Sequence, residues 1–112
     1  MKNIILMLRA GDEARADISL TPERVYYRFA TDSSIEDGNL PAIKEDFASF
    51  IYRLMSAAEP REGETSLDKS VKFEMYVDTR VKNIAMSEES LRRLVSILCE
   101  VSDEFLFLRG FC

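Results

Sequence analysis

Alternation of apolar and polar side chains over residues 14–21 is the feature that most constrains how this sequence can fold. Ala16, Ile18 and Leu20 fall on one side of an extended chain, and the residues between them are polar or charged. A period of two residues is typical of a strand that buries one face. A sheet with one apolar face needs a second layer of structure to cover it.

The neighbouring segments predict two more strands. Residues 3–10 contain the apolar run Ile4–Leu8, which ends at Gly11 and is typical of a strand buried on both faces. Residues 25–31 alternate again, after a turn that has Pro22 at its second position. The first 31 residues therefore predict a three-stranded antiparallel meander.

The rest of the chain predicts two helices and two further strands. Apolar residues at three- and four-residue spacings predict a helix from about Pro41 to Ala58. A second helix is expected after Ser87, a typical N-cap residue, with its inward face reaching Val101. Alternation predicts a strand over residues 71–78, and a buried last strand is expected over residues 105–108. Residues 32–40 and 59–68 are polar and are expected to be loops.

These elements define the expected fold class. Their order is β-β-β-α-β-α-β, within a single α+β domain that spans residues 1–112. We expect a layer sandwich of about five mainly antiparallel strands with two helices packed on one face. The first and last strands are the most apolar, so both are predicted to lie at the centre of the sheet.

Several kinds of chemistry are excluded by composition. The chain has no histidine, which removes Ser-His-Asp and Cys-His catalysis and histidine-ligated zinc. Its four glycines are scattered and form no phosphate-binding loop. Cys99 and Cys112 are expected to be free thiols. We therefore predict a protein that is not an enzyme, with no catalytic residues, cofactor or metal site. An enzyme that uses tyrosines and carboxylates is the remaining alternative.

The apolar runs are too short to place the chain in a membrane. The run near the N-terminus has five residues, Ile4 to Leu8. A signal peptide needs roughly 7–15 apolar residues and a membrane-spanning helix about 20. The sequence therefore predicts a cytoplasmic protein that makes no membrane contact.

The net charge of −5 is concentrated in one segment. Residues 32–64 hold eight acidic and three basic side chains, which accounts for the whole excess. Two interpretations are open: acidic loops keep a small protein soluble, or they form a binding face for a basic partner. The same charge disfavours direct binding to nucleic acid, because it repels the phosphate backbone.

The binding interpretation gives a specific functional hypothesis. We predict an inhibitor or immunity protein that occludes the active surface of a basic partner, such as a toxin nuclease domain. The alternative is a structural or regulatory homo-oligomer, joined through a sheet face or through Phe111. The residues predicted to contact the basic partner are six carboxylates and one tyrosine from the middle segment: Asp32, Glu36, Asp37, Glu45, Asp46, Tyr52 and Glu59.

Overall fold

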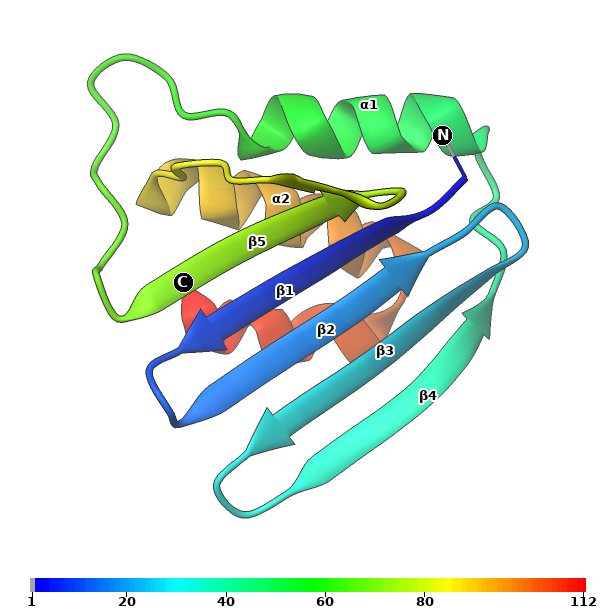
Figure 1. Ribbon diagram of the computed structural model, residues 1–112, viewed down its shortest axis with the longest axis horizontal. Helices are drawn as coiled ribbons and strands as arrows, with labels where there is room; N and C mark the ends of the chain where they lie inside the picture. The colour runs from blue at the N-terminus through cyan, green and yellow to red at the C-terminus, as the bar shows by residue number, and fades with distance from the viewer. Residues whose placement is uncertain (1) are drawn as a thin grey trace.

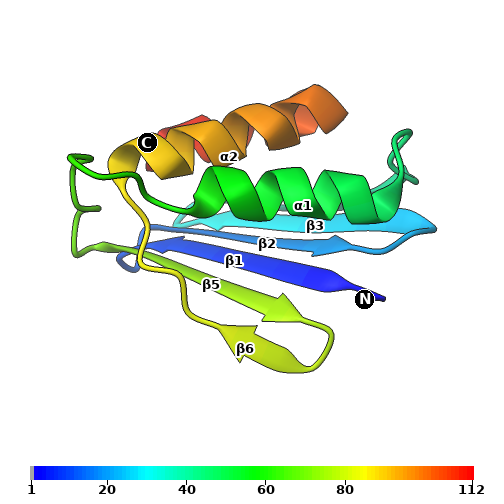
Figure 2. The same ribbon diagram turned by 90° about the horizontal axis from the view of Figure 1, so that it is seen from above.

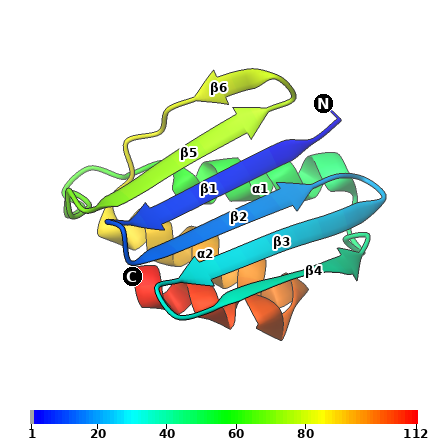
Figure 3. The same ribbon diagram turned by 60° about the horizontal axis from the view of Figure 1, so that its bottom comes forward.

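One antiparallel sheet forms the base of the molecule in the computed structural model, which describes residues 2–112. Within those residues the strands are β1 (Ile4–Ala10), β2 (Ala14–Leu20), β3 (Arg24–Thr31), β4 (Ile35–Pro41), β5 (Val71–Val77) and β6 (Arg80–Lys82). The helices are α1 (Phe47–Ala58), α2 (Glu88–Val101) and the 3₁₀ helix η1 (Asp103–Phe111). The strands are ordered β4-β3-β2-β1-β5-β6 across the sheet, as Figures 1 and 3 show together.

The molecule has two layers. All the helices lie against one face of the sheet, and no element among residues 2–112 covers the other face (Figures 2 and 3). The expected α+β sandwich with an antiparallel sheet and helices on one face is therefore confirmed.

The core lies between these layers and follows the alternation in the sequence. Leu6, Ile18 and Phe29 face the helices from three adjacent strands and are buried. Leu54 of α1 and Leu94 of α2 meet them from the other layer. Strand β1 is central, between β2 and β5, as predicted, but the prediction that both its faces are buried is wrong, because Ile5 and Met7 lie on the uncovered face and are only partly buried.

The prediction that residues 32–40 form a loop is wrong, because this segment contains strand β4. The whole strand pairs with β3, in a register that sets Gly38 opposite Tyr27. A side chain on Gly38 would approach the Tyr27 hydroxyl to 2.6 Å, so the missing Cβ makes room for the tyrosine ring. A polar sequence is tolerated here because β4 is an edge strand and lies largely in solvent.

The first helix begins later than predicted. Helix α1 starts at Phe47, and Pro41 ends strand β4 instead of opening the helix. The carboxylate of Asp46 accepts a hydrogen bond of 3.0 Å from the backbone N–H of Ser49, which is the geometry of an N-cap. The predicted end of the helix at Ala58 is confirmed.

The predicted last strand, residues 105–108, is wrong as well, because these residues lie in the 3₁₀ helix η1. Its buried side chains are Phe105, Leu108 and Phe111, which recur every third residue. A 3₁₀ helix has three residues per turn, so these three side chains share one face. The phenyl rings of Phe105 and Phe107 contact Phe29 of β3 and hold η1 under that part of the sheet.

The other elements predicted for the second half of the chain are present in the structure. The predicted strand over residues 71–78 is present as β5, and β6 adds a short strand that was not predicted. The hydroxyl of Ser87 accepts a hydrogen bond from the N–H of Ser90, which confirms the predicted cap of α2. Phe111 is buried in the core.

Candidate functional site

The free edge of the sheet at β4 carries carboxylates that form no ion pair within residues 2–112. Asp32 lies in the turn between β3 and β4, and Glu36 and Asp37 lie within β4. None of the ion pairs found among residues 2–112 involves these three side chains. The outer side of β4 has no neighbouring strand, so its outward backbone groups have no strand partner.

The 3₁₀ helix η1 brings a fourth carboxylate to this edge. Burial raises the pKa of the Tyr27 hydroxyl, and the charges of Glu104 and Glu36 raise it further. Glu104 precedes Phe105, whose ring centroid lies 6.0 Å from that of Tyr27, and Glu36 lies two residues before Gly38, which pairs with Tyr27. We name the group formed by Asp32, Glu36, Asp37 and Glu104 the acidic edge.

Glu36 and Asp37 point to opposite faces of the sheet. Glu36 pairs with Phe29, which is buried beneath the helices, whereas Asp37 pairs with Arg28 on the uncovered face. The acidic edge therefore presents carboxylates on both sides of one strand.

Two of the predicted site residues are engaged within the fold. Asp46 caps α1 through its hydrogen bond to Ser49. Glu45 accepts a hydrogen bond of 2.7 Å from the guanidinium of Arg53, which also contacts Glu100 at 3.1 Å. Both residues follow the C-terminal end of β4, whereas Asp32 precedes its N-terminal end. The length of the seven-residue strand therefore lies between them and Asp32.

The last two predicted site residues lie apart from the acidic edge. Tyr52 is 74% exposed on α1 and lines a groove between α1 and α2. Glu59 follows the C-terminal end of α1, and its backbone carbonyl accepts a hydrogen bond from Arg93. The structure therefore brings together only Asp32, Glu36 and Asp37 of the seven predicted residues.

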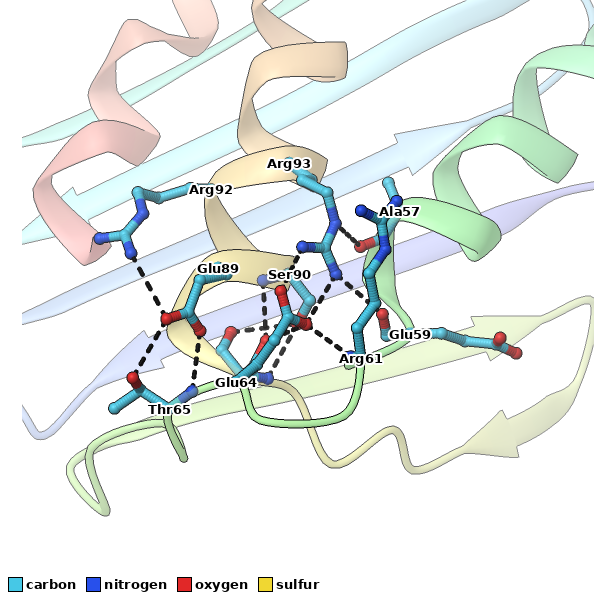
Figure 4. Close-up of polar contacts among 10 residues, drawn as sticks. Ala57, Glu59, Arg61, Glu64, Thr65, Glu89, Ser90, Arg92 and Arg93 are labelled. Atoms are coloured by element: carbon cyan, nitrogen blue, oxygen red, sulfur yellow. Dashed lines mark hydrogen bonds and ion pairs between the residues drawn. The ribbon is translucent and has the colours of Figure 1, made fainter.

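The loop after α1 holds Glu64, whose carboxylate is bonded to α2 (Figure 4). The guanidinium of Arg93 on α2 donates to both carboxylate oxygens of Glu64, one at 2.9 Å. It also donates to the backbone carbonyls of Ala57 and Glu59, so it ties the end of α1 to α2. Arg93 and Glu64 are 25% and 13% exposed, which makes this pair the least exposed ion pair among residues 2–112.

These contacts favour the ionised form of the Glu64 carboxyl. Hydrogen bonds from Arg93 and from the backbone of Arg61 lower the pKa of its carboxyl to about 2. Its neighbour in the loop, Thr65, donates through its hydroxyl and its backbone N–H to Glu89 of α2. The loop is therefore fastened to the first turns of α2 by charged hydrogen bonds.

The groove that contains Tyr52 is lined by basic side chains. It has a volume of about 570 Å³ and runs between the outer surfaces of α1 and α2. Its lining includes Arg53, Arg61, Arg92 and Arg93, with Ser56, Ala57, Ser96 and Ile97 between them. The sequence analysis predicted no function for these arginines, because the adjacent Arg92 and Arg93 are typical of a solvated helix face and Arg53 and Arg61 lie far from them in the chain.

The uncovered face of the sheet carries a row of polar residues. Glu74 of β5 accepts a hydrogen bond from Tyr76 and lies 3.7 Å from Arg9 of β1. Strands β1 and β2 separate this row from Tyr26 and Arg28 of β3, so the two do not form one continuous row.

The fold and these surfaces define a single-domain α+β protein with an acidic sheet edge and a basic groove between its helices. Among residues 2–112 no group of three or more candidate metal ligands was found, and no helix is long and apolar enough to cross a bilayer. Comparison with protein-family models, curated proteins and solved structures gives no match for this chain.

Proposed function

We propose that the protein is a binding module that docks a basic partner protein against the acidic edge. The observation that carries this proposal is the combination of a free strand edge with carboxylates that form no ion pair in the described part of the chain, residues 2–112. A free edge offers backbone hydrogen bonds to an added strand, which is a common mode of peptide recognition. The carboxylates select lysine and arginine side chains on the strand or loop that approaches.

Docking in this way blocks a partner whose own function depends on basic residues. Lysines and arginines that meet Asp32, Glu36, Asp37 or Glu104 are no longer available to bind phosphate groups. We therefore propose an inhibitory role, of the kind that an immunity protein has toward a toxin nuclease domain in the cytoplasm. Charges on an edge strand also prevent unspecific pairing between sheets, so binding must be measured directly.

The first test is capture of the partner from the source cells at low and at high salt. We expect one basic protein to be retained at low salt and released at high salt, because salt screens the contacts of exposed charges. The variant Asp32→Lys/Glu36→Lys should lose this protein. An equal yield with that variant would show that the acidic edge is not the binding surface.

A matched control and a second outcome make the test specific. Glu62→Lys/Glu59→Lys makes the same change of charge at two exposed residues of the loop after α1 and should capture the partner like the wild type. Recovery of only the protein itself, with a mass that rises with concentration, would instead support the homo-oligomer.

A further inference from the structure

The two edge strands of the sheet carry opposite charge. Strands β4 and β6 end the sheet on opposite sides (Figure 3). The residues of β6 are Arg80, Val81 and Lys82, and all three are exposed. None of the ion pairs found among residues 2–112 involves Arg80 or Lys82. The charge of β6 therefore complements the charge of the acidic edge.

The carboxylate that lies closest to β6 in the chain does not balance this charge. Asp78 lies in the turn before β6, and its side chain accepts hydrogen bonds of 2.7 and 3.0 Å from the backbone nitrogens of Lys2 and Asn3. Lys2 and Asn3 precede β1, which lies on the other side of β5 from β6. The side chain of Asp78 is therefore bonded away from the outer side of β6.

Alternate residues of β4 turn their backbone groups away from the sheet. The N–H of Thr31 donates to the carbonyl of Ser34 at 2.8 Å, so these two residues, on either side of the turn between β3 and β4, form a hydrogen-bonded pair. Along an antiparallel ladder such pairs alternate with pairs that are not hydrogen-bonded. The residues of β4 whose backbone groups point outward, away from β3, are therefore Ile35, Asp37 and Asn39.

The same reasoning gives one outward residue in β6. The N–H of Asp78 donates to the carbonyl of Asn3 at 2.9 Å, on the side of β1. Val77, which precedes Asp78, therefore turns its backbone groups toward β6, where it pairs with Arg80. Val81 follows Arg80, so its backbone groups point outward from the sheet.

One register matches the side chains of the two edges. Each strand is antiparallel to its neighbour, so β4 and β6 run in opposite directions, and a second copy that continues the sheet sets its β6 antiparallel to β4. With Val81 opposite Ile35, two apolar side chains that are 53% and 62% exposed meet on the uncovered face. The same register sets Arg80 opposite Glu36 on the helix side. Registers shifted by two or four residues along β4 set Val81 opposite a charged or polar side chain.

We propose that β6 of one copy pairs with β4 of the next, so that copies of this chain associate head to tail through the edges of their sheets. Backbone hydrogen bonds between Val81 and Ile35 and an ion pair between Arg80 and Glu36 hold the contact. The contact joins two different surfaces, so the assembly is open and its end copies each keep one free edge. This inference rests on the proposed function in that the second copy occupies the same acidic edge, in competition with the basic partner.

The test is sedimentation equilibrium of the purified protein at concentrations up to about 1 mM, because a contact through one short strand is small and weak. We expect the average mass to rise with concentration at low salt and to rise less at high salt. Glu36→Arg and Arg80→Glu should each weaken the association about tenfold or more, because each sets like charges opposite one another. Matched changes at exposed residues of the loop between α1 and β5, Glu62→Arg and Lys69→Glu, should leave it unchanged.

Exchange of the two charges identifies the contact. A chain with both changes, Glu36→Arg/Arg80→Glu, again sets opposite charges across the contact and should associate like the wild type. An equimolar mixture of the two single variants should associate as well, because each supplies the charge that the other needs. Circular dichroism and thermal unfolding should show that all the variants are folded.

Three results would overturn the inference. These are a monomeric mass at every concentration, association of Arg80→Glu like that of the wild type, and no recovery of association in the chain that carries both changes.

Failure of this inference is distinguishable from failure of the proposed function. Arg80→Glu leaves the acidic edge intact and should capture the basic partner at least as well as the wild type. If the wild type is monomeric but Arg80→Glu captures a basic partner, the inference is wrong and the proposed function stands. If the copies associate as expected but no basic partner is captured, the inference stands and the proposed function is wrong.

Discussion

The loop after α1 and the edge strand β4 both carry carboxylates from the acidic middle of the chain, but they differ in what those carboxylates contact. In the loop, Glu64 is bonded to Arg93 and has a strongly lowered pKa. In β4, Glu36 and Asp37 have no ion pair among residues 2–112. Glu64 stabilises the fold, whereas Glu36 and Asp37 remain available to a partner. A local excess of negative charge therefore includes carboxylates that serve the fold, and these cannot be counted as available to a partner.

The largest loss of stability is expected when the aromatic contact beneath the acidic edge is removed. Phe105 is fully buried and its ring packs against Tyr27 and Phe29. Phe105→Ala should lower the free energy of unfolding by about 3–5 kcal/mol, because it leaves a cavity under β3. Chemical denaturation measures this value. A loss below about 1 kcal/mol would show that η1 is not held by this packing.

The next largest loss of stability is expected at Glu64, in the loop after α1. Glu64→Gln should lower the midpoint of thermal unfolding by several degrees at neutral pH, because it removes the charge that faces Arg93. The pKa of Glu64 is lowered in the folded protein from 4.5 to about 2. Its contribution to stability is therefore complete above pH 4.5 and is lost as the pH falls toward 2.

This pH dependence separates the ion pair from a simple packing effect. The difference in stability between wild type and Glu64→Gln should be constant from about pH 5 to 8 and should shrink below that range. Thermal unfolding at a series of pH values measures it. A difference that stays the same down to about pH 3 would contradict the assignment of the lowered pKa to Glu64.

A smaller effect is expected at Asp46, which the sequence analysis placed in the binding face. Its carboxylate caps α1, so Asp46→Ala should cost about 1 kcal/mol of stability. Asp46→Ser, which keeps a cap, should recover most of that loss. Denaturation of both variants checks this, and equal stability of Ala and Ser would show that the cap contributes nothing.

The smallest effect on stability is expected at the acidic edge itself. Asp32→Lys/Glu36→Lys should change the free energy of unfolding by no more than about 0.5 kcal/mol per residue, because both side chains are exposed and neither forms an ion pair with any of residues 2–112. A loss of 2 kcal/mol or more in total would mean that these carboxylates hold the edge together.

The sequence predicts the secondary structure of segments whose apolar residues recur at a regular spacing, and it fails for segments that lack such a spacing. Strands β2 and β5 and helix α2 were predicted because each buries one side, which imposes a period of two or about 3.6 residues. Strand β4 was missed because an edge strand with little buried surface has no such pattern. The three-residue spacing of Phe105, Leu108 and Phe111 could have identified η1 before the structure did.

The candidate site was predicted less completely, because it depends on residues that are distant in sequence. Glu104 joins the acidic edge only through the packing of η1 beneath β3. The pairing of Glu64 with Arg93 likewise depends on the loop folding back onto α2. Neither contact leaves a local signal in the chain, whereas the N-cap role of Asp46 could have been read from its place before an apolar helix.

The most direct test of the acidic edge is the rate at which the captured partner associates with charge variants of the protein. We predict that Asp32→Lys/Glu36→Lys slows association about tenfold or more at low salt, and that this difference nearly disappears at high salt. Glu59→Lys/Glu62→Lys, with the same net charge, should associate at close to the wild-type rate. Equal rates for the two double variants would contradict the proposal that the acidic edge forms the binding surface.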